Sequence, residues 1–277
     1  MILVIGAEGM LGRDLMALLG ERGQGVDIAE IDITSLESVL QVISARKPDV
    51  VINCAAYTDV DGCESNTEKA MSVNGEGVGY LAMACRDNNI LLVQISTDYV
   101  FDGSKGVPYV EDDAPHPLSV YGESKLAGEM NAGFSPEHLI IRTQWLYGIH
   151  GKNFVETMLR LGAEKDELTV VDDQVGSPTW TVDLARAIIA LVDNGCRGIY
   201  HAANSEYCSW NGFARAIFAE AGLEVTVKTM TTTELNRPAP RPLYSTLDCS
   251  RLEKDTGFQP QSWRSALKEY LSARSLL

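Results

Sequence analysis

Short apolar runs rich in β-branched residues alternate with helical patterns along most of the chain. These runs are residues 2–5, 50–52, 91–95, 139–141, 168–171 and 198–200. Between the first two runs, an apolar stripe at helical spacing is formed by Leu11, Leu15, Leu18 and Leu19. Strands and helices that alternate in this way are typical of a parallel sheet covered on both faces by helices. The sequence therefore predicts an α/β fold built on a doubly wound parallel sheet.

Composition excludes several classes of protein. The chain has 277 residues, 45% of them hydrophobic, so it can bury a large core and is not a disordered protein. Its 23 basic and 38 acidic residues give a net charge of −15, which repels nucleic acid and anionic lipid surfaces. Six cysteines without a C-x-x-C pair, and only four histidines, predict reduced thiols and no metal site. The chain starts on an apolar strand without a basic leader and has no apolar stretch of membrane length, so we expect a cytoplasmic protein that does not contact membranes.

Three glycines follow the first predicted strand directly, at Gly6, Gly9 and Gly12. In dinucleotide-binding folds such glycines allow a tight turn, a close approach to a pyrophosphate, and close packing of helix on strand. The N-terminus of the next helix then offers free N–H groups to the phosphates. At the end of the second strand both Asp27 and Glu30 could meet the adenosine ribose, and no adjacent arginine is present for a 2′-phosphate. The pattern predicts a Rossmann-type domain that binds NADPH or NADH, without a choice between them.

Tyr121 and Lys125 are four residues apart and therefore share one face of a predicted helix. An ammonium beside a phenol lowers the phenol pKa, which suits a general acid that protonates a carbonyl oxygen. At the end of the preceding strand, Ser96 and Thr97 offer a hydroxyl to the same carbonyl. The constellation predicts reduction of a carbonyl group, with Tyr121 as the proton donor, Lys125 beside it, and the hydroxyl of Ser96 or Thr97 as a hydrogen-bond donor to the carbonyl oxygen.

From about residue 204 the pattern changes to a helix, a threonine-rich stretch and then alternating arginine and proline at 237–242. We therefore expect a second, smaller and mainly helical lobe that binds the substrate. The expected division assigns residues 1–148 and 166–203 to the dinucleotide-binding domain, and residues 149–165 and 204–277 to the lobe.

An ordered set of further motifs runs through nearly the whole chain. Besides the glycines it comprises Asp32-Ile33-Thr34, residues 48–61 (PDVVINCAAYTDVD), Val73-Asn74, residues 96–103 (STDYVFDG), residues 121–129 (YGESKLAGE), Arg142-Thr143-x-Trp145-x-Tyr147-Gly148, Asn153-Phe154, Asp173-Gln174-x-Gly176-x-Pro178-Thr179 and Arg241-Pro242. This set resembles the extended short-chain dehydrogenase/reductases, and more closely the dTDP-4-dehydrorhamnose reductase family. Some members of that family dimerise through carboxylate-bound magnesium, but no carboxylates of this chain could be matched to that site, so we predict no metal and a monomer or a homodimer.

The resemblance also implies roles for individual residues, because Thr97, Tyr121 and Lys125 match the catalytic positions of the family. It places the cofactor against the glycine loop, Tyr121 and Lys125, and further against Met10, Leu11, Asp32, Ile33, Ala55, Ala56 and Tyr57. It places the nucleotide sugar against Thr97, Asp98 and Trp145, and it implies that Asn74 orients the Lys125 side of the site through water. For the sugar diphosphate, polar and basic side chains in or near the lobe are candidates, namely Lys152, Asn153, Arg237 and Arg241.

The reaction implied is hydride transfer from NADPH or NADH to C4 of dTDP-4-dehydro-6-deoxy-L-mannose, which gives dTDP-L-rhamnose and ends dTDP-rhamnose biosynthesis. Lys125 would hold the cofactor ribose. A dehydratase or epimerase fits less well, because Asp98 is followed by Tyr99 where those enzymes carry a second acid. Two alternatives stay open. One is a reductase of another nucleotide 4-keto-6-deoxy sugar, and the other is a non-catalytic subunit like the regulatory subunit of methionine adenosyltransferase.

Overall fold

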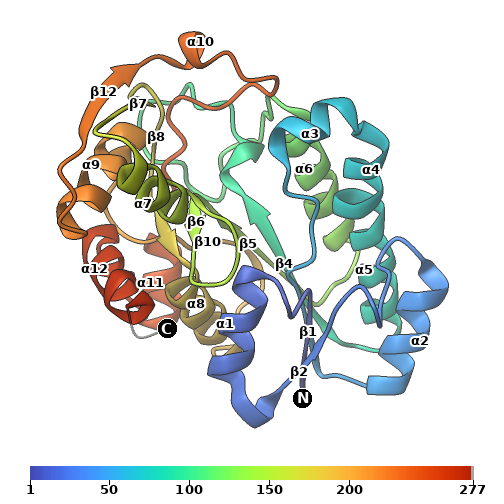
Figure 1. Cartoon of the computed structure of the whole chain (residues 1–277). Helices are drawn as coiled ribbons and strands as arrows, with labels where there is room; N and C mark the ends of the chain where they lie inside the picture. Colours follow the sequence, from blue (N-terminus) through green and yellow to red (C-terminus); the bar gives the residue numbers. More distant parts are fainter. Residues whose placement is uncertain (276–277) are drawn as a thin grey trace.

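The computed structural model describes residues 1–275, and its centre is a parallel sheet of six strands (Figure 1). Across the sheet the order is β10-β5-β4-β3-β1-β2. The strands are β1 (Ile2–Ile5), β2 (Gly23–Val26), β3 (Val50–Asn53), β4 (Leu91–Thr97), β5 (His138–Thr143) and β10 (Gly198–His201). The chain passes from β1 to β2 on one side and then crosses back over β1 to β3 on the other side. The carboxyl ends of β1 and β3 therefore flank the crevice where such sheets bind ligands.

Helices cover both faces of this sheet, as predicted. On one face lie α1 (Met10–Leu19) and α8 (Thr181–Asp193), whose leucines share an apolar core with β1, β4 and β5. On the other face lie α2 (Leu36–Arg46), α5 (Gly77–Asp87) and α6 (Val120–Ala132). The predicted fold class, a doubly wound parallel sheet, is confirmed.

The lobe has its own aromatic core. Three helices surround it, α7 (Phe154–Glu164), α9 (Trp210–Glu220) and α12 (Trp263–Arg274). The largest fully buried side chains in this core are those of Tyr147, Phe213, Trp263 and Tyr270. Of the two shorter helices in the C-terminal part, α11 (Ser250–Thr256) packs against the larger domain through Leu252, and the other is α10 (Thr232–Leu235).

One strand lies in a different sheet from the one predicted. The run 168–171 forms β7 (Glu167–Val171), which pairs in parallel with β12 (Thr226–Met230) of the lobe and not with the central sheet. The prediction was wrong because a central strand needs apolar side chains on both faces, whereas Glu167 and Thr169 of β7 are exposed. Within the expected division, residues 167–171 therefore pack with the lobe.

Short elements lie between the longer ones of the larger domain. Near β3 and β4 these are α3 (Val60–Ser65), α4 (Thr67–Met71), a π-helical turn η2 (Ser72–Glu76) and a 3₁₀ turn η3 (Asp98–Val100), and another 3₁₀ turn, η1 (Gly20–Arg22), precedes β2. Two small ladders lie outside the central sheet, β6 (Leu146–Tyr147) with β9 (Thr179–Trp180), and β8 (Val175–Gly176) with β11 (Cys208–Ser209).

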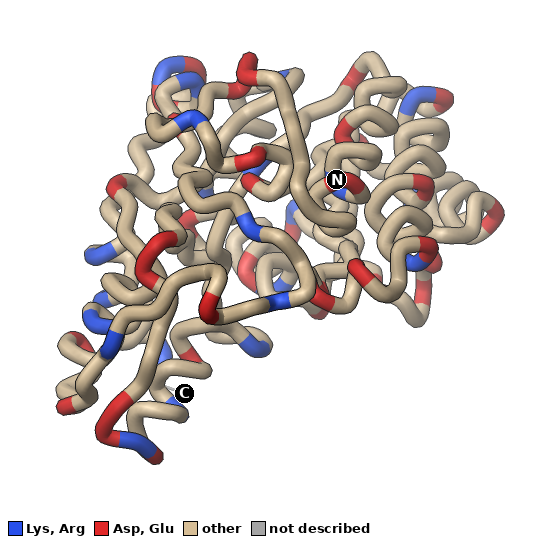
Figure 2. Tube along the Cα trace, turned by 90° about the horizontal axis from the view of Figure 1, so that it is seen from above, with Lys and Arg blue, Asp and Glu red and all other residues tan. Residues whose placement is uncertain are grey.

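The charged residues are spread over the molecule. Figure 2 shows lysines and arginines dispersed among the more numerous acidic residues. No helix within residues 1–275 combines the length and the apolar character that a membrane crossing requires.

Candidate active site

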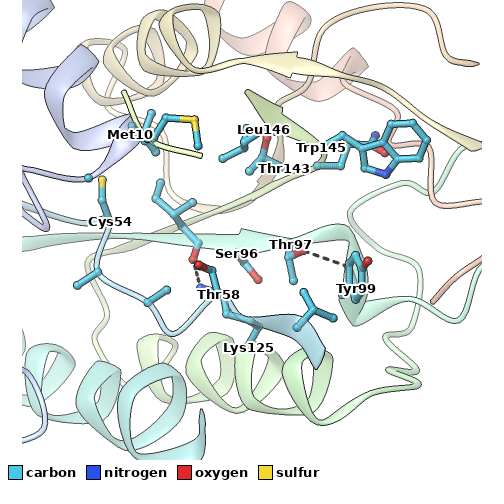
Figure 3. Close-up of a pocket in the computed structure, with 18 of the residues that line it drawn as sticks. Met10, Cys54, Thr58, Ser96, Thr97, Tyr99, Lys125, Thr143, Trp145 and Leu146 are labelled. Carbon is cyan, nitrogen blue, oxygen red and sulfur yellow. Dashed lines mark hydrogen bonds between the residues drawn. The ribbon is translucent and has the colours of Figure 1, made fainter. Parts of the chain in front are cut away.

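A cavity of about 910 Å³ opens at the carboxyl ends of β1, β3, β4 and β5. Its walls come from the glycine loop, from residues 54–56 after β3, from residues 96–99 after β4, from α6 and from residues 143–151. In Figure 3 the side chains of Thr97 and Lys125 face those of Thr143 and Trp145 across this space. A second cavity of about 450 Å³ continues it beyond Gly9 and Ala55, toward Asp32 and Ile33.

The glycine loop has the geometry that its spacing predicts. Gly6 has φ +77°, and a Cβ there would lie 2.8 Å from the Ala55 nitrogen. A Cβ on Gly12 would lie 2.1 Å from the Gly6 carbonyl oxygen, so α1 packs on β1 only with glycine at that position. Gly9 is the N-cap of α1 and no side chain caps the helix there, while Met10 and Leu11 line the larger cavity. The free N–H groups of this turn fit an anionic pyrophosphate.

Helix α6 brings the predicted general acid and the lysine to the cavity. The helix starts at an N-cap serine, Ser119, whose Oγ accepts a hydrogen bond of 3.2 Å from the Gly122 nitrogen. Tyr121 lies in the first turn, edge-on to Tyr99 at 5.5 Å between ring centroids. One turn later Lys125 is buried, and its Nζ donates a hydrogen bond of 2.7 Å to the Ile95 carbonyl oxygen.

The electrostatics of this pair differ from the prediction. Burial lowers the pKa of Lys125 to about 8, although Glu129, one turn further along α6, acts in the opposite direction. Burial also raises the pKa of the Tyr121 phenol, and a hydrogen bond with Thr97 only partly offsets this. The expected lowering of the Tyr121 pKa is not found, because burial of the phenol is the largest contribution and raises its pKa. Tyr121 stays protonated through the neutral range, which is the form that a proton donor needs.

The Asp98 carboxylate accepts hydrogen bonds from two hydroxyl groups, one of them that of Thr97. The Thr97 hydroxyl donates a hydrogen bond of 3.1 Å to Asp98 Oδ1, and the Ser245 hydroxyl donates one of 2.5 Å to Oδ2. The side chain is almost fully buried, and burial raises its pKa to about 7. Asp98 therefore lies behind Thr97, where it controls the orientation of the threonine hydroxyl.

Trp145 is held by Trp210, which the sequence did not indicate, and by Gly176, which was part of a sequence motif but had no assigned role. It has φ +48°, a strained value for a bulky side chain, and its ring stacks on that of Trp210 with centroids 3.6 Å apart and planes 7° apart. A Cβ on Gly176 would lie 2.6 Å from Trp145 Cε2, so a larger residue would displace the ring. The motif around Gly176 was a sequence signal for this contact. No motif indicated Trp210, because it lies in α9 of the lobe, far from Trp145 in the sequence.

The expected diphosphate ligands make other contacts. Asn153 caps α7, with its Oδ1 accepting from the Glu156 nitrogen at 3.1 Å, and its Nδ2 donates to the Gly148 carbonyl at 2.7 Å. Arg241 Nη1 lies 3.1 Å from Asp61 Oδ1, and Arg237 pairs with the same carboxylate at 3.3 Å. The described walls of the two cavities include none of Lys152, Asn153, Arg237 and Arg241.

Four of the other expected cofactor contacts line the smaller cavity or its junction with the larger one. Asp32 and Ile33 lie in its wall, and Ala55 and Ala56 border both cavities. Tyr57 lies in neither described wall, and its backbone nitrogen donates to Asn74 Oδ1 at 2.8 Å.

The contacts of Asn74 are with the backbone and α6. Its Nδ2 donates to the Tyr57 carbonyl at 2.9 Å and to Ser124 Oγ at 3.0 Å. Asn74 thus fixes the loop after β3 against α6, at Ser124, which is the neighbour of Lys125 in the sequence. Among residues 1–275 no group of three His, Cys, Asp or Glu side chains is placed to hold a metal ion.

Comparison with known proteins supports the motif resemblance. Residues 1–275 match the family model described as the RmlD substrate binding domain. A dTDP-4-dehydrorhamnose reductase of Streptomyces griseus is 46% identical, over 98% of this chain and 93% of that protein. The structure of a dTDP-4-dehydrorhamnose reductase from Clostridium acetobutylicum matches with a TM-score of 0.96 and 44% identity, over 99% of both chains. One from Bacillus anthracis, solved in complex with NADP, matches with a TM-score of 0.96 and 38% identity, over 98% of both chains.

The match extends over nearly the full length of all three proteins, and the glycine loop, the Tyr121–Lys125 pair and the hydroxyl of Thr97 meet at one cavity. The chain therefore belongs to the RmlD substrate binding domain family, the family of the dTDP-4-dehydrorhamnose reductases.

Proposed function

We propose that the protein is an oxidoreductase that converts dTDP-4-dehydro-6-deoxy-L-mannose to dTDP-L-rhamnose with NADPH or NADH, the last step of dTDP-rhamnose biosynthesis. The observation that carries the proposal is the meeting of Thr97, Tyr121 and Lys125 at the cavity that begins on the glycine loop. Full-length similarity to proteins named dTDP-4-dehydrorhamnose reductases supports the choice of substrate.

Reduction of the C4 ketone needs a hydride and a proton. Bound NADPH or NADH supplies the hydride to C4. Tyr121 donates its phenolic proton to the carbonyl oxygen, so that the C=O bond becomes CH–OH. Lys125, buried beside this site, holds the nicotinamide-side ribose and keeps positive charge near the phenolate that forms.

Thr97 polarises the same carbonyl oxygen in this mechanism. Its hydroxyl proton points to Asp98 while the carboxylate is ionised. When Asp98 is protonated, the acid donates to Thr97 Oγ1, and the threonine proton is free for the substrate. A buried carboxyl with a pKa of about 7 is partly protonated under neutral conditions, as this role requires.

The larger domain is assigned to the cofactor and the lobe to the nucleotide sugar. Trp145, whose ring stacks on Trp210 of the lobe, lines the cavity between them. We further propose that the protein works in the cytoplasm, because its six cysteines are all unpaired within the described residues and suit a reducing compartment. We expect it to be a monomer or a homodimer.

The test is dinucleotide oxidation, followed by nicotinamide absorbance. The substrate is made in situ from dTDP-glucose by the upstream dehydratase and epimerase, and NADH and NADPH are tested separately. We expect substrate-dependent oxidation and dTDP-L-rhamnose as the product. Oxidation with a different product would point to another keto-sugar, and a bound dinucleotide without turnover would point to a regulatory subunit.

Tyr121→Phe is the matched control, since it removes only the phenolic oxygen. We expect it to bind the dinucleotide normally and to lose about 10²- to 10⁴-fold in kcat, the usual contribution of a positioned general acid. Full turnover by this variant would refute the assignment.

A further inference from the structure

Two buried charges close to the site have no part in the proposed mechanism. Glu129 lies near the end of α6 and Arg142 lies in β5, and their side chains are 4% and 1% exposed. Arg142 donates two hydrogen bonds to the carboxylate, from Nε to Glu129 Oε1 at 2.9 Å and from Nη2 to Oε2 at 2.7 Å. Taking two charges out of water costs free energy that their attraction often fails to recover, so such a pair adds little to stability. Its position in the structure points to another role.

The end of β4 adds a third hydrogen bond to this carboxylate. The Ser96 hydroxyl donates to Glu129 Oε1 at 2.5 Å, and Ser96 lies beside Arg142 in the register of β4 with β5. Arg142 is itself held by the ring of Phe101, 5.0 Å from its guanidinium carbon, and by the Glu111 carbonyl oxygen, to which Nη1 donates at 3.4 Å. Glu129 is therefore fixed by two strands whose carboxyl ends border the cavity.

Helix α6 places this fixed carboxylate one turn beyond Lys125. Tyr121, Lys125 and Glu129 are spaced by four residues, so they share one face of the helix. The end of β4 contacts this face twice, because the Ile95 carbonyl oxygen accepts from Lys125 Nζ at 2.7 Å and the next residue, Ser96, binds Glu129. The ammonium of Lys125 thus has a buried and immobile carboxylate as its neighbour.

Glu129 provides the negative charge that acts on Lys125. It favours the ammonium form and opposes burial, which lowers the pKa of Lys125 to about 8. The Cys54 thiol after β3 also faces Lys125, but burial raises its pKa to about 12 and keeps it neutral. Tyr121, one turn before Lys125, is neutral as well, because burial raises its pKa. Without Glu129 the ammonium would have no countercharge and would lose its proton at a lower pH.

We propose that Glu129, fixed by Arg142 and Ser96, is a positioning residue that supplies the countercharge of Lys125 in the reaction. The inference rests on the proposed function, because it concerns the lysine of that reaction. Glu129 lines neither of the two cavities, so it acts on the substrate and the cofactor through Lys125. Arg142 neutralises part of the countercharge. Removing one or the other member of the pair should therefore change Lys125 in opposite directions.

Two substitutions that break the same ion pair give the test. Glu129→Gln removes the countercharge, so we expect the fall in kcat/KM near pH 8 to move down by about 1 pH unit. Arg142→Gln leaves the carboxylate without its arginine, so we expect the fall to move up. Arg142→Lys keeps the cation and should leave the fall in place. Glu123→Gln makes the same change as Glu129→Gln at an exposed position of α6, and as the matched control it should also leave the fall in place.

A purely structural ion pair would give a different result. Glu129→Gln and Arg142→Gln would then lower kcat/KM by a similar factor at every pH, and the fall would stay in place or move in the same direction in both. Either result would overturn the proposal. If Glu129→Gln does not fold, the double variant with Arg142→Gln leaves no unpaired charge and should still move the fall to lower pH. An unmoved fall in the double variant would overturn the proposal as well.

Dinucleotide binding separates this inference from the proposed function. Calorimetric titration with NADH and with NADPH, over the pH range of the rate profile, needs no turnover. Because Lys125 holds the nicotinamide-side ribose in the proposed mechanism, we expect affinity to weaken as the pH rises, and to do so at a lower pH in Glu129→Gln than in the wild type. This shift in a wild type without turnover would contradict the proposed function alone. Turnover by the wild type, with the same pH dependence of binding and of rate in Glu129→Gln, would contradict the role of Glu129 alone.

Discussion

Asp98 and Lys125 make the proposed reaction depend on pH in a defined direction. Asp98 ionises near pH 7 and then holds the Thr97 proton, and Lys125 loses its charge near pH 8. We expect kcat/KM to fall in two steps as the pH rises through these values. In Asp98→Asn the amide donates to Thr97 at every pH, so the step near pH 7 should disappear while the step near pH 8 remains. A pH profile of kcat/KM for both proteins checks this, and identical profiles would exclude Asp98 as the titrating group.

Trp210 is a positioning residue for Trp145. Removing its ring takes away an aromatic contact of about 0.5–1.5 kcal/mol, and the strained backbone of Trp145 then relaxes. For Trp210→Ala we expect KM for the nucleotide sugar to rise up to about tenfold with kcat little changed, and Trp210→Phe to restore much of the loss. The steady-state parameters of the two variants give the measurement.

A spectroscopic signature separates this role from general destabilisation. The chain has four tryptophans, and the face-to-face pair should give an exciton couplet in the far-ultraviolet circular dichroism. Trp210→Phe should remove the couplet, and Trp180→Phe, in another part of the lobe core, should keep it. A couplet that survives in Trp210→Phe would contradict the stacked arrangement.

At the scale of elements, the contact between α6 and η2 positions the catalytic face of α6. A Cβ on Gly128 would lie 2.2 Å from the Asn74 carbonyl oxygen, so the helix reaches its place only with glycine there. Gly128→Ala should cost about 1–3 kcal/mol in the free energy of unfolding, the usual cost of overpacking. It should also lower kcat, because Lys125 lies one turn away on the same helix.

Gly133→Ala is the matched control for that substitution. Gly133 follows α6, has φ −62°, and is exposed, with its nearest contact at 3.3 Å. We expect a change within about 0.5 kcal/mol, as for ordinary surface substitutions. Urea denaturation of both variants gives the comparison, and equal costs would show that the contact with Asn74 is not tight.

At the scale of the whole molecule, Asp61 of α3 ties the lobe to the larger domain. It accepts hydrogen bonds from Arg237, from Arg241 and from the Ala239 nitrogen, at 3.1–3.3 Å. Burial by itself would raise the pKa of Asp61, but the hydrogen bonds from Arg241 and Ala239 hold it below the usual value. A carboxyl group whose pKa is lower in the folded than in the unfolded protein stabilises the fold at pH values above its unfolded-state pKa of about 3.9. That stabilisation is lost as the pH falls through the pKa of the folded protein.

Asp61→Asn should therefore be less stable than the wild type at pH 7, by about 1–3 kcal/mol as is common for hydrogen bonds to a charged group. The difference in unfolding free energy should shrink as the pH falls from 7 to 3. Arg237→Ala removes a side chain that is 58% exposed, so it should lower the free energy of unfolding much less than Asp61→Asn does. A difference that stays constant with pH would show that the charge of Asp61 does not hold the lobe.

Features that depend on neighbours in the sequence could be predicted. The alternation of strands and helices, the turn at Gly6 and the shared helix face of Tyr121 and Lys125 follow from backbone sterics and from periods of two and 3.6 residues. These features are sufficient to predict the sheet and the position of the site at its carboxyl edge. The family resemblance rested on the same motifs.

Features that depend on contacts between distant segments required the tertiary structure. The pairing of β7 with β12, the stack of Trp210 on Trp145 and the pairing of Arg241 with Asp61 each join residues more than 50 positions apart. The raised pKa values of Tyr121 and Asp98 depend on how completely the surrounding elements exclude water. Local pattern in the sequence thus determined which chemistry is present, and long-range burial and pairing decided how each group is oriented and charged.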